Sequence, residues 1–235
     1  MHVILIPGFW LDASSWDQVV PSLQQAGHRT HPLTLPGMDA KTTDRAKITL
    51  SDHVDAVVNV IDSLDPADGK VAIVGHSGGG AIAHAAVDAR PDRVARVVYV
   101  DSWPAGQGDA INAGLPAENG EVPLPDWSLF DDEDLVDLDD GLRAAFRERA
   151  IPTPEHVARD GQQLFDERRY GVPATVVACE FPSAKLREWM AQGEPNLQEL
   201  AKLRDTTYVD LPTGHWPQLT KPAELAAAIT HALAR

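Results

Sequence analysis

The sequence contains little cysteine, little positive charge and no long apolar run. Cys179 is the only cysteine among 235 residues, which excludes an intramolecular disulfide and a cysteine-rich metal cluster. Lys and Arg number 20 against 35 Asp and Glu, so the formal net charge is −15. This balance argues against nucleic acid and anionic membranes as partners, because both bind basic surfaces. No apolar run approaches the ~18–20 residues that span a bilayer, and no signal-like segment is evident, so we expect a cytoplasmic protein.

Positive charge is absent from one long segment in particular. No Lys or Arg occurs from Val97 to Leu142, while the run Asp131–Asp140 holds seven carboxylates in ten residues. Such a run is typical of a solvated surface segment. The alternative is an acidic lid beside a binding site, which would disfavour anionic substrates.

Short apolar runs alternate with amphipathic segments along most of the chain. Six runs rich in β-branched residues predict buried strands, at 2–6, 30–35, 70–75, 96–101, 174–179 and 206–211. Five segments have the apolar spacing of helices, at 14–26, 50–64, 79–89, 184–192 and 223–234. This alternation predicts an α/β fold, with a mostly parallel sheet and helices on both faces.

One region interrupts the alternation. Between Ser102 and Gly171 the sequence shows no strand pattern but many prolines and acids, followed by helical stretches at 141–150 and 153–169. An insertion of this size between two strands predicts a helical cap at about 103–171, over one edge of the sheet. We find no internal repeat and no low-complexity linker, so we expect a single domain over residues 1–235 with this cap inserted.

The stretch VAIVGHSGGGAIAHAA, residues 71–86, surrounds Ser77 with four glycines. It follows a predicted strand and opens a predicted helix, the strand–turn–helix setting in which a G-x-S-x-G turn exposes a nucleophilic serine. The helix N-terminus favours negative charge beside that hydroxyl. A phosphate-binding turn is the competing interpretation, but the Lys-Ser/Thr of a P-loop and a G-x-G-x-x-G after the first strand are both missing.

On these residues the chain resembles the alpha/beta-hydrolase fold family over essentially its whole length, nearest to serine esterases of the plant-esterase and hydroxynitrile-lyase type. The segment PGFWLDASSW after the first strand is similar to an HG-x…W segment of that branch, with Pro7 in place of the usual His. The resemblance implies an oxyanion hole made by the backbone N–H groups of Phe9 and Gly78. It also implies a structural role for Trp16.

A serine hydroxyl needs a base that takes its proton. Among nine histidines, His215 stands in a Gly-His loop between the last predicted strand and the last predicted helix. The catalytic histidine of the resembled family occupies that place. We expect His76, next to the serine, to line the pocket or to pack. The histidines show no metal-ligand spacing, so we expect no metal and no cofactor.

Two carboxylates are candidates for the acid behind His215. The resembled family usually places an Asp just past the strand that follows the cap, but no Asp lies between Val172 and Asp205. Glu180 lies in that region. Asp101 ends the strand after the serine helix, where some family members carry the acid, and a carboxylate there can still orient an imidazole. The missing Asp favours Asp101, with Glu180 as the alternative.

Several of the six tryptophans fall near these residues, and Trp10, Trp103 and Trp216 are expected to line a substrate pocket. An aromatic pocket under an acidic cap favours a neutral, apolar small molecule. We therefore predict a serine hydrolase that cleaves a neutral carboxylic ester, thioester or lactone through an acyl-enzyme intermediate. Its oligomeric state cannot be predicted from the pattern.

Two other functions are compatible with the same fold. A non-catalytic small-molecule receptor could keep the serine turn without turnover, because fold does not fix function. A hydroxynitrile lyase of the resembled branch is expected to carry a Thr after the first strand and a Lys after the catalytic histidine. This sequence has Phe9 and Trp216 in those places, which disfavours the lyase.

Overall fold

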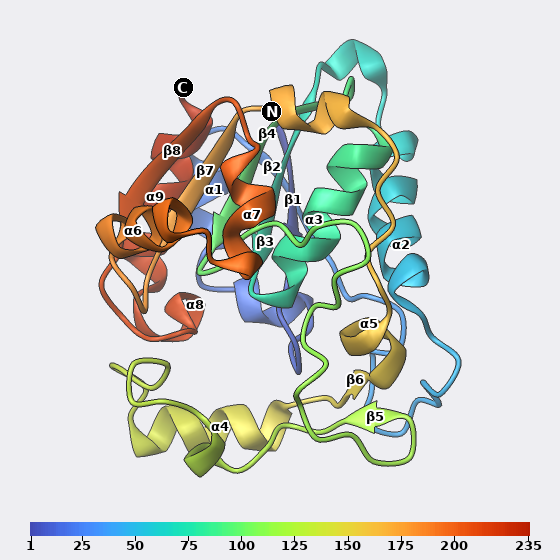
Figure 1. Cartoon of the computed structure of the whole chain (residues 1–235), viewed down its shortest axis with the longest axis vertical. Coiled ribbons are helices and arrows are strands. Elements are labelled where there is room, and N and C mark those ends of the chain that lie inside the picture. Colours follow the sequence, from blue (N-terminus) through green and yellow to red (C-terminus); the bar gives the residue numbers. More distant parts are fainter.

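A computed structural model, which describes residues 1–235, assembles the six predicted strands into one sheet (Figure 1). The strands are β1 (His2–Ile6), β2 (Arg29–Pro32), β3 (Val71–His76), β4 (Val94–Val100), β7 (Ala174–Ala178) and β8 (Thr206–Asp210). Their order in the sheet is β2-β1-β3-β4-β7-β8, and every neighbouring pair is parallel. The predicted α/β fold is therefore confirmed.

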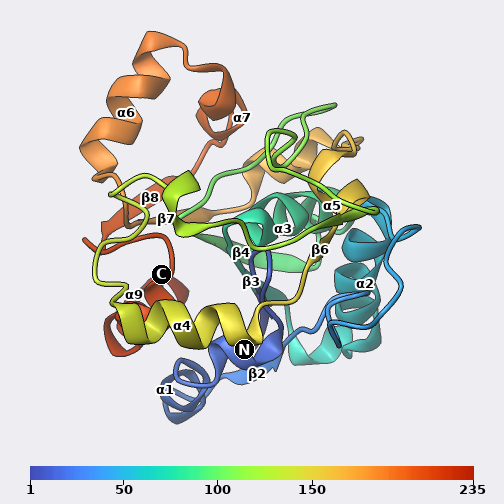
Figure 2. The same cartoon turned by 90° about the horizontal axis from the view of Figure 1, so that it is seen from below.

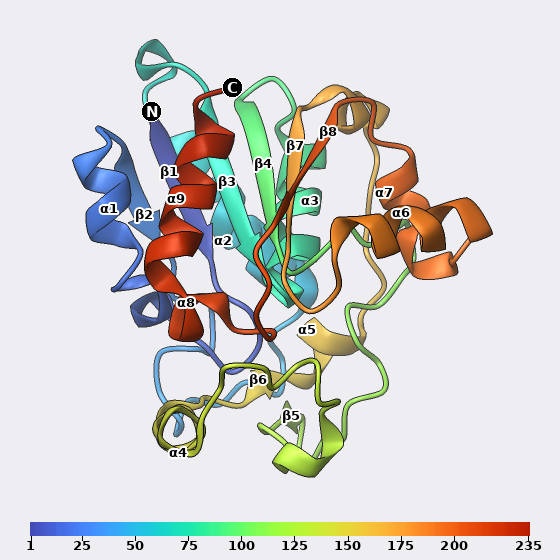
Figure 3. The same cartoon turned by 90° about the vertical axis from the view of Figure 1, so that its left-hand side faces the viewer.

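Helices cover both faces of this sheet (Figure 3). Side chains alternate along β1, so that Val3 and Leu5 enter one core while Ile4 and Ile6 enter the other. The first core is closed by α1 (Val20–Gln25) and α9 (Pro222–Leu233), and the second by α2 (Leu50–Ser63) and α3 (Gly78–Ala89). The continuous burial of β1 and β3 follows from this double cover.

The remaining helices are short and lie mainly near the carboxyl ends of the strands. They are α6 (Ser183–Gln192), α7 (Gln198–Ala201) and α8 (Pro217–Thr220). The helix predicted at 14–26 is two pieces, a 3-10 helix at Ala13–Trp16 and α1, with Pro21 in the first turn of α1. None of the helices combines the length and apolar composition needed to cross a membrane.

Most of the inserted segment 103–171 lies past the carboxyl ends of the strands, at the end of the molecule away from both termini, and its last part runs back along α3 toward the N-terminus (Figures 1 and 2). It contains α4 (Asp140–Arg149) and α5 (Glu155–Arg159). It also contains a small antiparallel sheet of β5 (Glu121–Val122) and β6 (Thr153–Pro154). The sequence analysis expected no strand here, because two residues per strand are too few for an alternating pattern.

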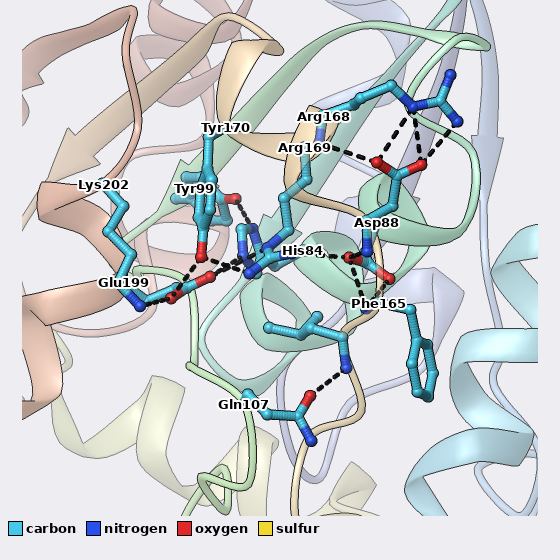
Figure 4. Close-up of polar contacts among 12 residues, drawn as sticks. His84, Asp88, Tyr99, Gln107, Phe165, Arg168, Arg169, Tyr170, Glu199 and Lys202 are labelled. Atoms are coloured by element: carbon cyan, nitrogen blue, oxygen red, sulfur yellow. Dashed lines mark hydrogen bonds and ion pairs between the residues drawn. The ribbon is translucent and has the colours of Figure 1, made fainter.

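The second helical stretch predicted in this segment is mostly wrong. Helix α5 ends at Arg159, and the chain then runs without helix along α3 to a 3-10 helix at Glu167–Gly171. The backbone N–H groups of Phe165 and Asp166 donate to the Asp88 carboxylate of α3, at 2.8–3.0 Å (Figure 4). These contacts replace helical hydrogen bonds with bonds to a residue about eighty positions earlier.

Asp88 also belongs to a buried ionic network, which consists of His84, Asp88, Arg169 and Glu199 (Figure 4). Arg169 Nη1 donates to Asp88 Oδ1 at 3.0 Å, and Arg169 Nε donates to Glu199 Oε1 at 3.1 Å. His84 Nε2 lies 3.1 Å from the same Glu199 oxygen. The network joins α3 to α7 and to the end of the inserted segment.

Candidate active site

Ser77 occupies a sharp turn between β3 and α3. Its backbone has φ 51° and ψ −127°, in the left-handed half of the map that a residue with a β-carbon rarely adopts. The turn is held on both sides, because the Ser77 N–H donates to Val100 O at 3.1 Å and the Ser102 hydroxyl donates to Ser77 O at 2.6 Å. The serine hydroxyl is thereby fixed at the carboxyl end of β3.

The glycines around Ser77 are required by close approaches. A β-carbon on Gly79 would lie 2.6 Å from Pro7 O, closer than real β-carbons come to backbone. A β-carbon on Gly80 would lie 2.9 Å from the Ser102 β-carbon and would collide with its hydroxyl. Gly80 therefore leaves room for the side chain that fixes the Ser77 carbonyl.

Three side chains picked out by the sequence meet at this turn. The Ser77 hydroxyl is 2.7 Å from His215 Nε2, and His215 Nδ1 is 2.7 Å from Asp101 Oδ2. His215 comes from the loop after β8, and Asp101 directly follows β4 with φ 43°. The other Asp101 oxygen accepts the N–H groups of Cys179 and Glu180 at 2.9 and 3.2 Å. These contacts make a continuous Ser–His–Asp chain.

Glu180 reaches the same histidine. Its Oε1 lies 2.6 Å from His215 Nδ1, but this oxygen lacks good hydrogen-bond geometry to any group. A single N–H at Nδ1 can point well at only one acceptor, and it points at Asp101. The structure therefore brings both acid candidates to one nitrogen, with the hydrogen bond directed to Asp101.

The cluster shifts the ionisation of each member. Burial acts to lower the pKa of His215, but the hydrogen bond to Asp101 and the nearby carboxyl group of Glu180 raise that pKa well above its ordinary value. Burial acts to raise the pKa of Asp101, while its hydrogen bond to His215 brings this pKa below the usual range. Burial raises the pKa of Glu180 to about 8, with the Asp101 charge acting in the same direction. Burial beside Asp101 therefore favours the protonated form of Glu180.

Two backbone N–H groups stand next to Ser77 and have no acceptor within the protein. Phe9 donates no backbone hydrogen bond, and Gly78 is the first residue of α3, where an N–H has no intrahelical acceptor. Both residues line the same cavity as Ser77. They are the pair that the resemblance assigned to an oxyanion hole.

A cavity of about 640 Å³ opens over these groups. Its apolar lining includes Phe9, Trp10, Trp103, Ile111, Leu115 and Phe130. Its ionisable lining consists of Asp101, Asp109, Asp134, Glu180 and His215, with no Lys or Arg. The cavity thus combines an apolar wall with a negative potential.

Two residues expected in the substrate pocket lie outside it. His76 is fully buried beneath the site, where its Nε2 is 2.6 Å from His215 O and its Nδ1 accepts from Gln218 Nε2 at 2.9 Å. Burial lowers the pKa of His76 to about 3. Trp216 is 1% exposed and packs edge-on against Phe130 and Phe146. His76 therefore supports the loop that carries His215, and Trp216 packs against the inserted segment.

The acidic run of the inserted segment lies over the catalytic loop. The N–H of His215 donates to Asp134 O at 2.8 Å, and the N–H of Gly214 donates to Val136 O at 3.0 Å. Six of the seven acidic residues in this run are exposed, as expected of a solvated surface segment, while Asp134 lines the cavity, as the lid alternative expects. Sequence reasoning missed Asp134 and Phe130 individually, although their position in or beside the acidic run was a usable signal.

Asp101, Glu180 and His215 also offer ligand atoms that lie within 4.8 Å of one another. The separations of 2.6 and 2.7 Å at Nδ1 are hydrogen-bond distances. Ligands around a metal with bonds of about 2.1 Å would stand farther apart. The arrangement fits a shared proton better than a metal ion.

Comparison with known proteins identifies the family. A sequence profile described as the alpha/beta hydrolase family matches residues 3–228, so the chain belongs to that family. Methylesterase 10 of Arabidopsis thaliana is 25% identical over 267 aligned positions, covering 100% of this chain and 92% of the relative. Methylesterase 8 of the same plant is 35% identical over 103 residues, which are only 38% of its own length. The chain lies close to the plant esterases and is similar to carboxylic ester hydrolases.

Solved structures agree on the fold. An extracellular alpha/beta-hydrolase from a Paenibacillus species superposes with a TM-score of 0.74 at 21% identity, over 99% of this chain and 98% of that chain. A pyrethroid hydrolase from Sphingobium faniae superposes with a TM-score of 0.73 at 23% identity, over 100% and 98%. These likenesses extend to the inserted segment, because they cover nearly all of both chains.

Proposed function

We propose that the chain is a serine hydrolase that cleaves a neutral carboxylic ester through an acyl-enzyme intermediate. The observation that carries the proposal is the continuous contact from the Ser77 hydroxyl through His215 to Asp101 at the edge of a cavity. The names of similar proteins, methylesterases and a pyrethroid hydrolase, support ester chemistry. A thioester or lactone reacts through the same steps and fits the same proposal.

In the acylation step the Ser77 oxygen attacks the ester carbonyl while His215 Nε2 takes the hydroxyl proton. Asp101 accepts the hydrogen bond of Nδ1–H, which fixes the ring and stabilises the imidazolium as it forms. The carbonyl oxygen becomes an oxyanion, which the N–H groups of Phe9 and Gly78 receive. Donors of this kind contribute about 3–4 kcal/mol each when they are already oriented.

Collapse of the tetrahedral intermediate breaks the bond to the alcohol oxygen. His215 returns its proton to that oxygen, and the alcohol leaves. A water molecule then enters, gives a proton to His215 Nε2 and attacks the acyl carbon, which releases the acid and restores the Ser77 hydroxyl. The strained Ser77 turn keeps the nucleophile at the cavity wall throughout both halves.

The ionisable lining selects the charge of the substrate. Asp101 and the other cavity carboxylates have no Lys or Arg among them to neutralise an anionic substrate. A substrate carboxylate would face like charges in a partly desolvated cavity, where repulsion is stronger than in water. The apolar wall favours acyl or alcohol groups of matching character. A neutral ester is therefore the preferred substrate class.

The test compares two methyl benzoates that differ at the para position, methyl 4-methylbenzoate with a neutral methyl group and monomethyl terephthalate with a carboxylate. We expect turnover of the neutral ester and at least a ~10-fold lower kcat/KM for the anion, the effect of about 1.4 kcal/mol of repulsion. Ser77→Ala should abolish both activities, while Ser63→Ala, at an exposed site on α2, should change neither. Binding of the ester by wild type without any turnover would instead support the non-catalytic receptor.

A further inference from the structure

Two carboxyl groups stand at the one nitrogen of His215 that faces away from Ser77. Asp101 Oδ2 is 2.7 Å and Glu180 Oε1 is 2.6 Å from Nδ1. A triad needs one acid, and the hydrogen bond of Nδ1–H is already satisfied by Asp101. Glu180 is buried, with its side chain 13% exposed, and no lysine or arginine forms an ion pair with it. The mechanism described above gives this side chain no task.

We propose that Glu180 is a second positioning carboxyl for His215, which stores a proton beside Asp101 in the native enzyme and replaces Asp101 as the acid when the charge at that position is removed. The inference rests on the proposed function, because it concerns the same histidine. In this proposal Asp101 and Glu180 are not alternatives, because both carboxyl groups act on the same imidazole ring.

The arrangement of charges explains why Glu180 must hold a proton. Asp101 comes from the end of β4, Glu180 from the end of β7, and Asp134 from the acidic run, and all three line the cavity around His215. Glu180 has a neighbouring thiol, Cys179, whose pKa is raised by burial and which therefore stays neutral. With no cation in this group except the imidazolium itself, two ionised carboxylates at Nδ1 would repel each other.

Such a group titrates as a unit. One proton is shared between Glu180 and His215, and only when it sits on Glu180, or is lost, is Nε2 free to accept the proton of Ser77. Loss of the shared proton leaves two negative charges next to the imidazole, which makes His215 a stronger base. The proposal therefore predicts that kcat/KM of the wild type rises with pH through the apparent pKa of the cluster.

Removing the charge of Asp101 changes the state of Glu180. The Asp101 charge is one of the causes that raise the pKa of Glu180, so Asp101→Asn lowers that pKa and favours the ionised form of Glu180 next to the imidazole. An ionised Glu180 oxygen at its present distance from Nδ1 can then accept the hydrogen bond and hold the ring. Because Glu180 Oε1 already lies 2.6 Å from Nδ1, this requires no movement of the main chain.

The test is a double-mutant cycle on 4-nitrophenyl acetate, with wild type, Asp101→Asn, Glu180→Gln and the double variant. We expect kcat to fall about 10–100-fold in Asp101→Asn and about 3–10-fold in Glu180→Gln, with KM little changed. The double variant should fall at least ~10-fold further than the product of the two single effects, because each carboxyl partly covers for the other. Multiplicative effects, or a double variant no worse than Asp101→Asn, would overturn the proposal.

A second readout excludes a merely structural role and does not need turnover. The titration of His215, followed by NMR of the labelled imidazole, should stay above the ordinary pKa in Asp101→Asn and fall to it only in the double variant. In Glu180→Gln the rise of kcat/KM should move to lower pH. If the wild type hydrolyses no ester, the proposed function fails, while the NMR titration still decides the role of Glu180: an ordinary His215 pKa in Asp101→Asn contradicts it.

Discussion

Two buried histidines in this protein stand beside carboxylates, and the two clusters differ in one component. In the buried ionic network, Arg169 pairs with both Asp88 and Glu199, and His84 also contacts Glu199. In the cluster around His215, Asp101 and Glu180 contact the histidine, and no arginine or lysine lines the cavity beside them. The Arg169 guanidinium is therefore the component that the buried ionic network has and the cluster around His215 lacks.

The ionisation of the two glutamates shows the consequence. Burial acts to raise the pKa of Glu199, yet hydrogen bonds from His84 and Lys202, with others from Arg169, lower this pKa to about 2. Burial raises the pKa of Glu180 to about 8, and the negative charge of Asp101 acts in the same direction. The surroundings of Glu199 therefore favour its ionised form, and those of Glu180 favour its protonated form.

Helix α3 connects the two clusters, because it begins directly after Ser77 and carries His84 and Asp88 about two and three turns further on. The buried ionic network connects α3 to α7 and to the last part of the inserted segment (Figure 4). The nucleophile turn therefore rests on a helix that is fixed by charge pairs at its far end. A rigid support of this kind keeps a strained turn in its reactive geometry.

The largest expected effect comes from removing the balancing charge. Arg169→Met leaves Asp88 and Glu199 buried without their cation, and we expect the free energy of unfolding to fall by about 3–5 kcal/mol. Urea denaturation at pH 7 measures the change. Lys202→Met is the matched control, because Lys202 contacts the same Glu199 from a side chain that is 55% exposed, and it should cost less than about 1 kcal/mol. Equal losses in the two variants would remove the distinction drawn here.

The next prediction is that a Glu→Gln substitution changes the stability of the protein in opposite directions in the two clusters. Glu180 has its pKa raised from 4.5 to about 8, so the unfolded chain loses this proton at lower pH than the folded chain, and stability falls as pH rises from 4.5 to 8. Glu180→Gln should therefore stabilise the protein at pH 8, by about 1–3 kcal/mol.

Glu199 behaves in the opposite way. Its lowered pKa contributes stability that is present above pH 4.5 and is lost as pH falls toward 2. Glu199→Gln should destabilise the protein at neutral pH and make little difference near pH 2. Thermal melting of both variants from pH 3 to 8 tests the pair, and a loss of stability in Glu180→Gln at pH 8 would contradict the account.

Much of the fold could be predicted because the strands are short, β-branched and continuously buried, as β1 and β3 are. Ser77 and His215 could be picked out because each stands in a loop with a distinctive local pattern. The positions of residues that depend on partners far away in the sequence could not be predicted. Nothing near Phe165 indicates that its N–H binds Asp88, and no local pattern distinguishes a cavity wall from the buried sites of His76 and Trp216.

The acid was the least predictable member of the site for the same reason. Asp101 and Glu180 are 79 residues apart and reach one nitrogen only because β4 and β7 are neighbours in the sheet. From the sequence the two residues are alternatives, because their spacing along the chain does not show that both side chains reach the same histidine.

The smallest effect tests how the uncompensated charges act on substrate. Asp134→Asn removes one carboxylate from the cavity wall without touching Ser77. We expect kcat/KM for monomethyl terephthalate to rise about threefold, equivalent to about 0.6 kcal/mol, with a smaller change for methyl 4-methylbenzoate. Added salt should reduce the difference, because screening weakens charge repulsion in a partly open cavity. An equal rise for both esters would indicate a steric effect instead.

The central claim is that Ser77 is a nucleophile activated by His215, and covalent labelling tests it most directly. A fluorophosphonate probe should modify wild type at a single site, located to Ser77 by peptide mass, and His215→Ala should slow the labelling at least ~100-fold because the serine loses its base. An intact, folded wild type that gains no adduct at Ser77, or that is labelled as fast without His215 as with it, would contradict the account.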